Sequence, residues 1–209
     1  MVGTMNVGSA LLTTTDGVSV EAEWAVPEGA TAIAVLSHPH PMMGGDMTAP
    51  VPDALFRGLP ERAIGALRFN FRGVGESGGR HGGGVEEVAD VVAAIGHAGE
   101  VGRGATVWLA GYSFGADVSL QVADDRIGGW VLIAPTLRTV PPASMLAGDD
   151  GRPKHLLVPE HDQFCGPVDA EVFVSECDWR ATTVSVVPGA DHFLTGRLDV
   201  VVDAVASRI

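Results

Sequence analysis

Apolar residues in this chain form two kinds of pattern, short runs typical of strands and longer stripes with helical spacing, and the two kinds alternate. Segments 6–13 and 17–26 lie on either side of Thr15-Asp16-Gly17, and Asp-Gly between apolar runs predicts a β-hairpin. The rest of the pattern predicts, in order, a strand at 31–36, a helix at 48–64, a strand at 65–71, a helix at 85–97, a strand from 106, a helix to about 124, strands at 129–134 and 155–158, a helix at 168–176, a strand at 182–187 and a helix at 197–207.

The alternation of strands and helices predicts an α/β fold. Its central sheet should be mostly parallel, with helices on both faces and an antiparallel hairpin at the N-terminal end. No segment has the composition of a linker, so we expect residues 1–209 to form a single domain. The longest irregular connection, Pro135 to Pro153, is too short to be a second domain but long enough to drape over a pocket.

The composition narrows the range of partners. The 209 residues carry 26 acidic and 13 basic side chains, a formal net charge of -13, which repels phosphate backbones and anionic lipid. We therefore expect a neutral or cationic small-molecule substrate and no nucleic-acid or membrane binding, and we leave homo-oligomerisation open.

Cys165 and Cys177 form no C-x-x-C pair and are too few for a disulfide framework. Residues 1–7 lack the basic start of a leader, and no segment approaches ~20 apolar residues, so a cytoplasmic location is expected.

The segment Gly111-Tyr112-Ser113-Phe114-Gly115 lies between an apolar strand and a helical pattern. A serine on such a tight turn projects its hydroxyl at the head of the sheet, and the flanking glycines remove Cβ atoms that would collide. Gly75-Glu76-Ser77-Gly78-Gly79 has the same G-x-S-x-G spacing, but it lies in a loop that holds seven glycines between residues 72 and 84. The context therefore favours Ser113 over Ser77 as a nucleophile.

A serine nucleophile needs a histidine base and a carboxylate that orients the base. His192 follows the strand predicted at 182–187 and so reaches the same sheet edge as Ser113, because parallel strands deliver their following loops to one edge. Asp162 follows the strand at 155–158 and is favoured as the acid, with Glu160 behind it. Asp191 is adjacent to His192 in sequence and is expected to cap the loop or the last helix instead. Surface, capping or strand positions are expected for His81, His97 and His155.

An acyl-transfer site also needs two donors for the oxyanion. The backbone N–H of Phe114, directly after the nucleophile, is one, and the other should come from the loop after residues 31–36. In that loop the N–H of His40 is available, because its neighbours Pro39 and Pro41 have none. An alternative interpretation takes four residues as metal ligands, and the lack of a recognised zinc spacing argues against it; the four are His38, His40, His161 and Asp162.

The chain resembles the α/β-hydrolase superfamily over nearly its whole length. The order of Ser113, Asp162 and His192 matches that family's nucleophile, acid and base order. More narrowly, Ser37-His38-Pro39-His40-Pro41 with Gly44-Gly45, and the segment from Arg68 to Ser77, look like a compact bacterial subgroup of lidless hydrolases similar to dienelactone-hydrolase-like esterases. The resemblance implies an open, shallow pocket and a structural role for the loop around Ser77. One departure is His38-Pro39, where the family usually has His-Gly.

We therefore expect a serine hydrolase that cleaves a small carboxylic ester through an acyl-enzyme intermediate, with no cofactor and no metal. Two alternatives stay open. The same three residues can act on an amide, a thioester or a carbon-carbon bond, since one fold hosts many chemistries. The chain can also be a catalytically silent binding protein with a hydrolase fold.

Overall fold

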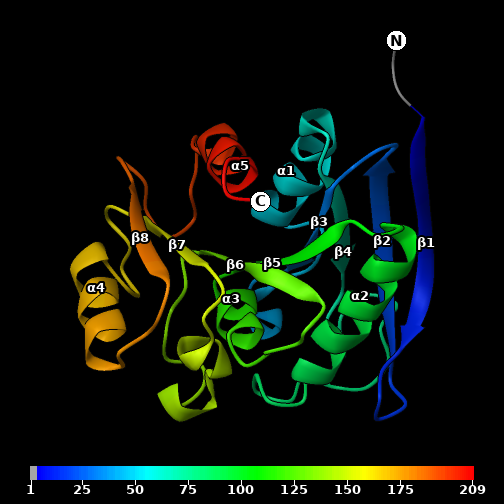
Figure 1. Cartoon of the computed structure of the whole chain (residues 1–209). Helices are drawn as coiled ribbons and strands as arrows, with labels where there is room; N and C mark the ends of the chain where they lie inside the picture. The colour runs from blue at the N-terminus through cyan, green and yellow to red at the C-terminus, as the bar shows by residue number, and fades with distance from the viewer. Residues whose placement is uncertain (1–3) are drawn as a thin grey trace.

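The computed structural model describes residues 4–209; residues 1–3 of the N-terminal segment discussed above lie outside the described residues. Its strands are β1 (Met5–Thr13), β2 (Ser19–Pro27), β3 (Ala32–Ser37), β4 (Gly65–Phe69), β5 (Thr106–Tyr112), β6 (Ile127–Ile133), β7 (Lys154–Pro159) and β8 (Thr182–Val187). They form one sheet in the order β1-β2-β4-β3-β5-β6-β7-β8 (Figure 1). β2 pairs antiparallel with both β1 and β4, and the remaining pairs are parallel. The predicted hairpin and mostly parallel sheet are confirmed.

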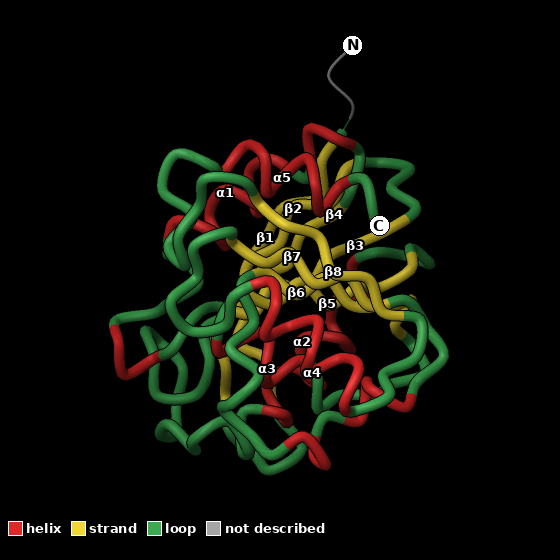
Figure 2. Tube along the Cα trace, turned by 90° about the vertical axis from the view of Figure 1, so that its left-hand side faces the viewer, coloured by secondary structure: helices red, strands yellow, loops and turns green. Residues whose placement is uncertain are grey.

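Helices cover both faces of the sheet, as predicted. They are α1 (Pro50–Gly58), α2 (Val88–Val101), α3 (Phe114–Ser119), α4 (Pro167–Glu176) and α5 (Leu198–Ala206). Figure 2 shows α1 and α5 on one side of the sheet and α2, α3 and α4 on the other. Each layer buries its own apolar cluster against the sheet. β3 is buried along its whole length because both of its faces are covered.

Two predicted helices have different bounds in the structure. The prediction of one helix over 48–64 was wrong, because α1 ends at Gly58 and a separate 3-10 helix, η2 (Pro60–Arg62), follows. Pro60 has no N–H for the helical ladder and its ring disfavours helical backbone before it. The helix expected at 85–97 runs from Val88 to Val101 instead. Val85 is 65% exposed, so it does not belong to the buried stripe.

The helix after Ser113 is much shorter than predicted. It ends at Ser119 rather than near Asp124. The carbonyl of Ser119 accepts a hydrogen bond from the Trp130 indole N–H at 3.1 Å, and the carbonyl of Leu120 accepts one from the Ala147 N–H at 3.0 Å. These donors come from distant parts of the chain and take the acceptors that further helical turns would use.

The long segment 135–153 is held by bonds to α3, to the chain after α3 and to the chain before β8. It contains the 3-10 helices η3 (Pro142–Ser144) and η4 (Leu146–Asp149). Ala147 bonds to Leu120 after α3, and the Arg180 N–H donates to the Gly148 carbonyl at 3.1 Å just before β8. The segment therefore packs against the side of the domain, and the fold has no lid.

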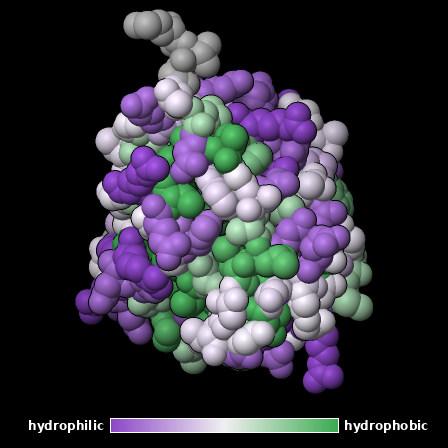
Figure 3. Space-filling view, turned by 90° about the vertical axis from the view of Figure 1, so that its right-hand side faces the viewer, coloured by the Kyte–Doolittle hydropathy of each residue, from purple (hydrophilic) through white to green (hydrophobic). Residues whose placement is uncertain are grey.

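β1 forms one edge of the sheet and is largely exposed. On this side of the molecule apolar patches alternate with polar ones (Figure 3), and Met5, Val7 and Leu11 of β1 are each exposed by more than two fifths. Within residues 4–209, the helices are all too short or too polar to cross a lipid bilayer.

Candidate active site

Ser113 lies at the sharp turn between β5 and α3. Its backbone has φ 54° and ψ -117°, a conformation that side chains with a Cβ rarely adopt. The Ser113 N–H donates to the Ile133 carbonyl of the neighbouring strand at 2.9 Å, which holds the turn against β6. A Cβ at Gly111 would overlap the backbone of Gly115 and Ala116, and one at Gly115 would overlap the backbone of Ser37. Both glycines are therefore needed for α3 to start this close to β3 and β5.

Three predicted residues meet at this turn. Ser113 Oγ lies 2.9 Å from His192 Nε2, and His192 Nδ1 lies 2.8 Å from Asp162 Oδ2. All three side chains are nearly or fully buried. Because Nδ1 faces a carboxylate, it carries the proton, and the lone pair of Nε2 can accept the proton of the Ser113 hydroxyl. The structure thus brings Ser113, His192 and Asp162 together, while their catalytic role stays a prediction.

The other candidate acid, Asp191, has the capping position expected for it. Its Oδ1 accepts a hydrogen bond from the Phe193 N–H at 3.1 Å, within the loop that carries His192. Glu160 also bonds to this loop, since its Oε2 accepts from the Gly189 N–H at 2.7 Å. Neither carboxylate contacts the His192 ring by hydrogen bond. Asp162 alone of the three aligns with Nδ1.

Tyr112, for which the sequence predicted no role, supports His192. Its phenol donates a hydrogen bond to the His192 carbonyl at 2.9 Å, and its ring stacks on the His192 ring with centroids 5.7 Å apart. Burial and the nearby Asp162 and Asp191 carboxylates raise the pKa of Tyr112, so its hydroxyl stays protonated and donates. Tyr112 thereby ties the turn at Ser113 to the loop that carries His192.

The loop after β3 is held by the buried side chain of His38. The Phe71 N–H donates to His38 Nε2 at 3.0 Å, so this nitrogen accepts, and Nδ1 donates to the Pro39 carbonyl at 2.7 Å. Burial lowers the pKa of His38 to about 4, which keeps the ring neutral and preserves both bonds. His38 therefore fastens the loop to the end of β4 and is committed to a structural role.

His40 lies next to Phe114, with ring centroids 4.9 Å apart. The His40 carbonyl accepts from the N–H groups of Met43 and Gly45, which closes the loop into the 3-10 helix η1 (Pro41–Met43). A Cβ at Gly45 would overlap the Pro39 carbonyl. Among residues 4–209, the N–H groups of His40 and Phe114 donate to no backbone acceptor. Both groups are thus free to donate to a ligand, as an oxyanion site requires, and that role remains a prediction.

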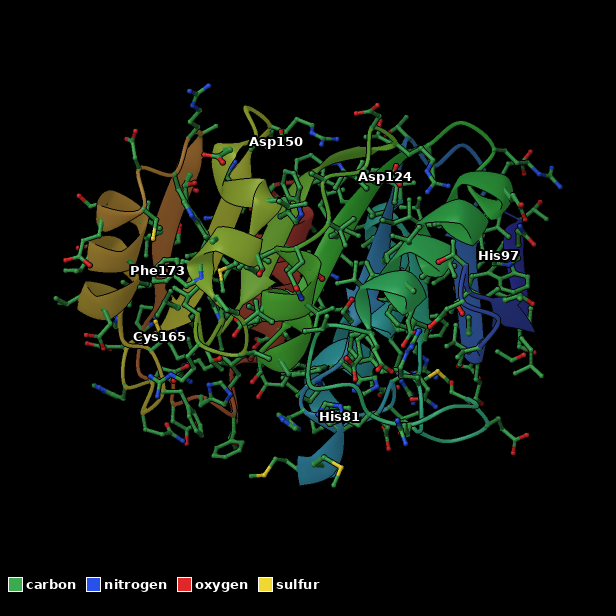
Figure 4. All side chains as sticks on the ribbon, turned by 90° about the horizontal axis from the view of Figure 1, so that it is seen from below. His81, His97, Asp124, Asp150, Cys165 and Phe173 are labelled. Atoms are coloured by element: carbon green, nitrogen blue, oxygen red, sulfur yellow. The ribbon has the colours of Figure 1, made fainter. Side chains whose placement is uncertain are left out.

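His81 also lies at this site, although its sequence position indicated only an exposed or capping role. Its ring centroid is 5.0 Å from that of His40 and 5.4 Å from that of Phe114. His81 Nδ1 lies 2.8 Å from Oε1 of Glu87, a fully buried carboxylate that also accepts from the N–H groups of Gly82 and Gly84. In Figure 4 His81 lies well apart from His97, which packs on Trp24 of β2. Only the tertiary structure shows that His81 lies at the site and that His97 does not.

Asp117, in α3, holds the loop that follows β6. Its fully buried carboxylate accepts the backbone N–H groups of residues 136, 137, 138 and 139 at 3.0 to 3.3 Å, and the Thr136 hydroxyl at 2.6 Å. Leu137 has φ 56°, so the loop turns sharply around this carboxylate. No local sequence pattern indicates this role, because the five donors lie about twenty residues away.

The two alternative assignments do not match the geometry. Ser77 Oγ donates to the Asn70 carbonyl at 2.8 Å and accepts from the Glu21 N–H at 2.9 Å, so its hydroxyl is used within the loop. Of the residues considered as metal ligands, His38 and Asp162 are engaged in the bonds described above. In the described part of the chain, no three His, Cys, Asp or Glu side chains gather as a metal site would need.

Comparisons with known proteins agree with this geometry. No family model matches the chain. RP471, an uncharacterised protein of Rickettsia prowazekii, is 31% identical over 170 residues, which cover 77% of this chain and 71% of that protein. An alpha-beta serine hydrolase homologue from Coxiella burnetii is 29% identical, with a TM-score of 0.85 over 97% of both chains. XC6422 of Xanthomonas campestris, an a/b serine hydrolase without lid, is 25% identical, with a TM-score of 0.83 over 97% of this chain and 94% of that one. The chain therefore has the α/β serine hydrolase fold, in the form of its lidless subgroup.

Proposed function

We propose that this protein is a serine esterase that hydrolyses small carboxylic esters through an acyl-enzyme on Ser113. The observation that carries the proposal is the continuous line of hydrogen bonds from the Asp162 carboxylate through the His192 ring to the Ser113 hydroxyl. A serine hydroxyl is a weak nucleophile unless a base takes its proton, and this line supplies the base and orients it.

In the first half of the reaction, Ser113 Oγ attacks the ester carbonyl carbon while His192 Nε2 takes the hydroxyl proton. The carbonyl oxygen becomes an oxyanion that accepts hydrogen bonds from the N–H groups of His40 and Phe114. The bond between the carbonyl carbon and the alcohol oxygen then breaks, and His192 gives its proton to the departing alcohol. The acyl group remains as an ester of Ser113.

In the second half, water takes the place of the alcohol. The water oxygen attacks the acyl carbon while His192 accepts a proton from the water, and a second oxyanion forms between the same two N–H groups. Collapse of this intermediate releases the carboxylic acid and returns the proton to Ser113 Oγ. Each residue thus does the same work twice, and no cofactor is required for the atoms to balance.

The proposal is tested by labelling and turnover together. A fluorophosphonate probe should modify Ser113, seen as a mass increase on the peptide that contains it, and p-nitrophenyl acetate should be hydrolysed. Ser113→Ala should abolish labelling and lower kcat by about 10⁴-fold to 10⁶-fold. Ser77→Ala is the matched control, since its serine has the same flanking glycines; labelling and turnover should persist in this variant.

Two results would redirect the proposal. Failure of the folded wild-type protein to react with the fluorophosphonate would favour a silent binding protein. A kcat/KM for the acetyl thioester or acetyl anilide far above that for the ester of matched size would favour the other bond types.

Asp162→Asn should lower kcat by about 10⁴-fold while leaving the probe site intact, because the amide no longer holds His192 in the tautomer that has its proton on Nδ1.

A further inference from the structure

Two phenylalanines beside His192 are exposed, in contrast to the other five in the chain. Phe164 is 38% exposed and Phe193 59%, whereas Phe69, Phe71 and Phe114 are almost completely buried and the remaining two are partly so. Large exposed aromatic side chains in a soluble domain indicate a binding surface when they gather at one place. Both of these follow a strand of the parallel sheet and contact the same imidazole.

Their positions are held by the site itself. The Phe164 N–H donates to Asp162 Oδ1 at 2.8 Å, and the Phe193 N–H donates to Asp191 Oδ1 at 3.1 Å. Each phenylalanine therefore stands two residues after an aspartate that turns its backbone. The Phe164 ring meets the His192 ring edge to face with centroids 4.5 Å apart, and the Phe193 ring does so at 5.8 Å.

The chemistry of the proposed reaction places the alcohol part of the ester here. The departing alcohol must receive its proton from His192 Nε2, so its oxygen lies within hydrogen-bond distance of this ring. The group attached to that oxygen then lies along the same imidazole, next to the rings that border it. The oxyanion, by contrast, lies on the side of His40 and Phe114.

Negative charge around His192 disfavours an alcohol that carries an anionic group. Glu160 and Asp191 are exposed carboxylates in the loops that surround the two rings. They repel an anionic group at this position, while the aromatic faces attract an apolar one. Resting on the esterase function proposed above, we propose that the preferred substrates carry an alcohol that bears an apolar ring and no negative charge, and that packs against Phe164 and Phe193.

The experiment compares benzyl acetate with ethyl acetate, whose alkoxide leaving groups have similar basicity and whose acetyl-enzyme is identical. Phe164→Ala should lower the ratio of kcat/KM for benzyl acetate to kcat/KM for ethyl acetate about tenfold, the loss typical of a well-packed aromatic contact. The double variant Phe164→Ala/Phe193→Ala should lose the benzyl preference entirely. Val7→Ala, on the opposite edge of the sheet, is the control and should change neither value.

The rate of deacylation separates a contact with the alcohol from a merely structural role. The alcohol has left before water attacks, so any loss that the phenylalanine variants cause through the His192 ring should slow deacylation and acylation by ethyl acetate alike, and the further loss with benzyl acetate should appear in acylation only. Equal losses for both esters, a deacylation slowed as much as acylation by benzyl acetate, or an unchanged benzyl preference in the double variant would each overturn this inference and leave the esterase function standing. No hydrolysis of either ester by the wild-type protein would instead overturn the proposed function and this inference with it.

Discussion

Tyr112→Phe removes one oxygen atom from the support of the base and leaves the aromatic ring in place. The lost hydroxyl donates to the His192 carbonyl at 2.9 Å, and the tyrosine is only 6% exposed. The variant therefore creates no large cavity, and the stacking of the ring on His192 can persist. What remains is a buried carbonyl oxygen without its donor.

The expected loss of stability follows from the unpaired His192 carbonyl. A buried acceptor left unpaired costs about 1–3 kcal/mol, so we expect the free energy of unfolding to fall by about 2 kcal/mol. For a chain of this size each kcal/mol corresponds to about 2–4 °C, which predicts a fall in Tm of about 4–8 °C. The loop that carries His192 also loses its tie to the elbow. We expect kcat on p-nitrophenyl acetate to fall about tenfold, with little change in KM, because small misplacement of a catalytic group is costly.

Thermal unfolding by circular dichroism and steady-state kinetics measure these two effects. Because Tyr112 is the only tyrosine, absorbance near 295 nm reports its ionisation alone. Burial raises its pKa, so the phenol should stay protonated in the folded protein above pH 10, where a free tyrosine ionises, and should ionise on unfolding. A Tm within 1 °C of wild type and a kcat within twofold would refute the supporting role of Tyr112.

Three further variants test other contacts of the site. Asp117→Asn replaces one acceptor oxygen with an amide N–H2 donor that faces backbone N–H groups, and it should lower the free energy of unfolding in urea by about 3–5 kcal/mol; a fall below about 1 kcal/mol would contradict this. Gly115→Ala should cost about 1–3 kcal/mol and lower kcat, since its Cβ overlaps β3, whereas Gly99→Ala, with free space in α2, should be neutral or stabilising. The depressed pKa of His38 means that its stabilising effect is present above pH 6.5 and lost as pH falls to about 4, by about 3 kcal/mol in all. Unfolding measured across that range should show a smaller loss for His38→Gln than for wild type, and an equal loss would exclude His38 as the cause.

The strands were the most predictable part of the fold. β3 is an almost unbroken apolar run that follows the turn at residues 27–29, and β8 was predicted to the residue. Helix ends were harder, because tertiary donors decide them. α3 stops where the Trp130 indole and the Ala147 N–H take its carbonyls, and neither group is near in sequence.

The site shows the same division. Ser113, His192 and Asp162 were predictable because parallel strands deliver the loops after β5, β7 and β8 to one edge of the sheet. This placement follows from chain direction and does not depend on side-chain packing. Tyr112, His81 and Asp117 were missed because their roles depend on partners in other loops.

The sequence alone determined the alternation of strands and helices, the elbow at Ser113 and the edge at which its partners collect, because these follow from local periodicity and from chain direction. The sequence favoured Asp162 over Asp191 as the partner of His192, and only the tertiary structure brings the Asp162 carboxylate, thirty residues away in sequence, to 2.8 Å from His192 Nδ1. The tertiary structure also decided that the His38 side chain holds the loop after β3 by its bond to Phe71, and that the His40 N–H is free. Both results depend on the close packing of this loop and of α3 that Gly45 and Gly115 permit.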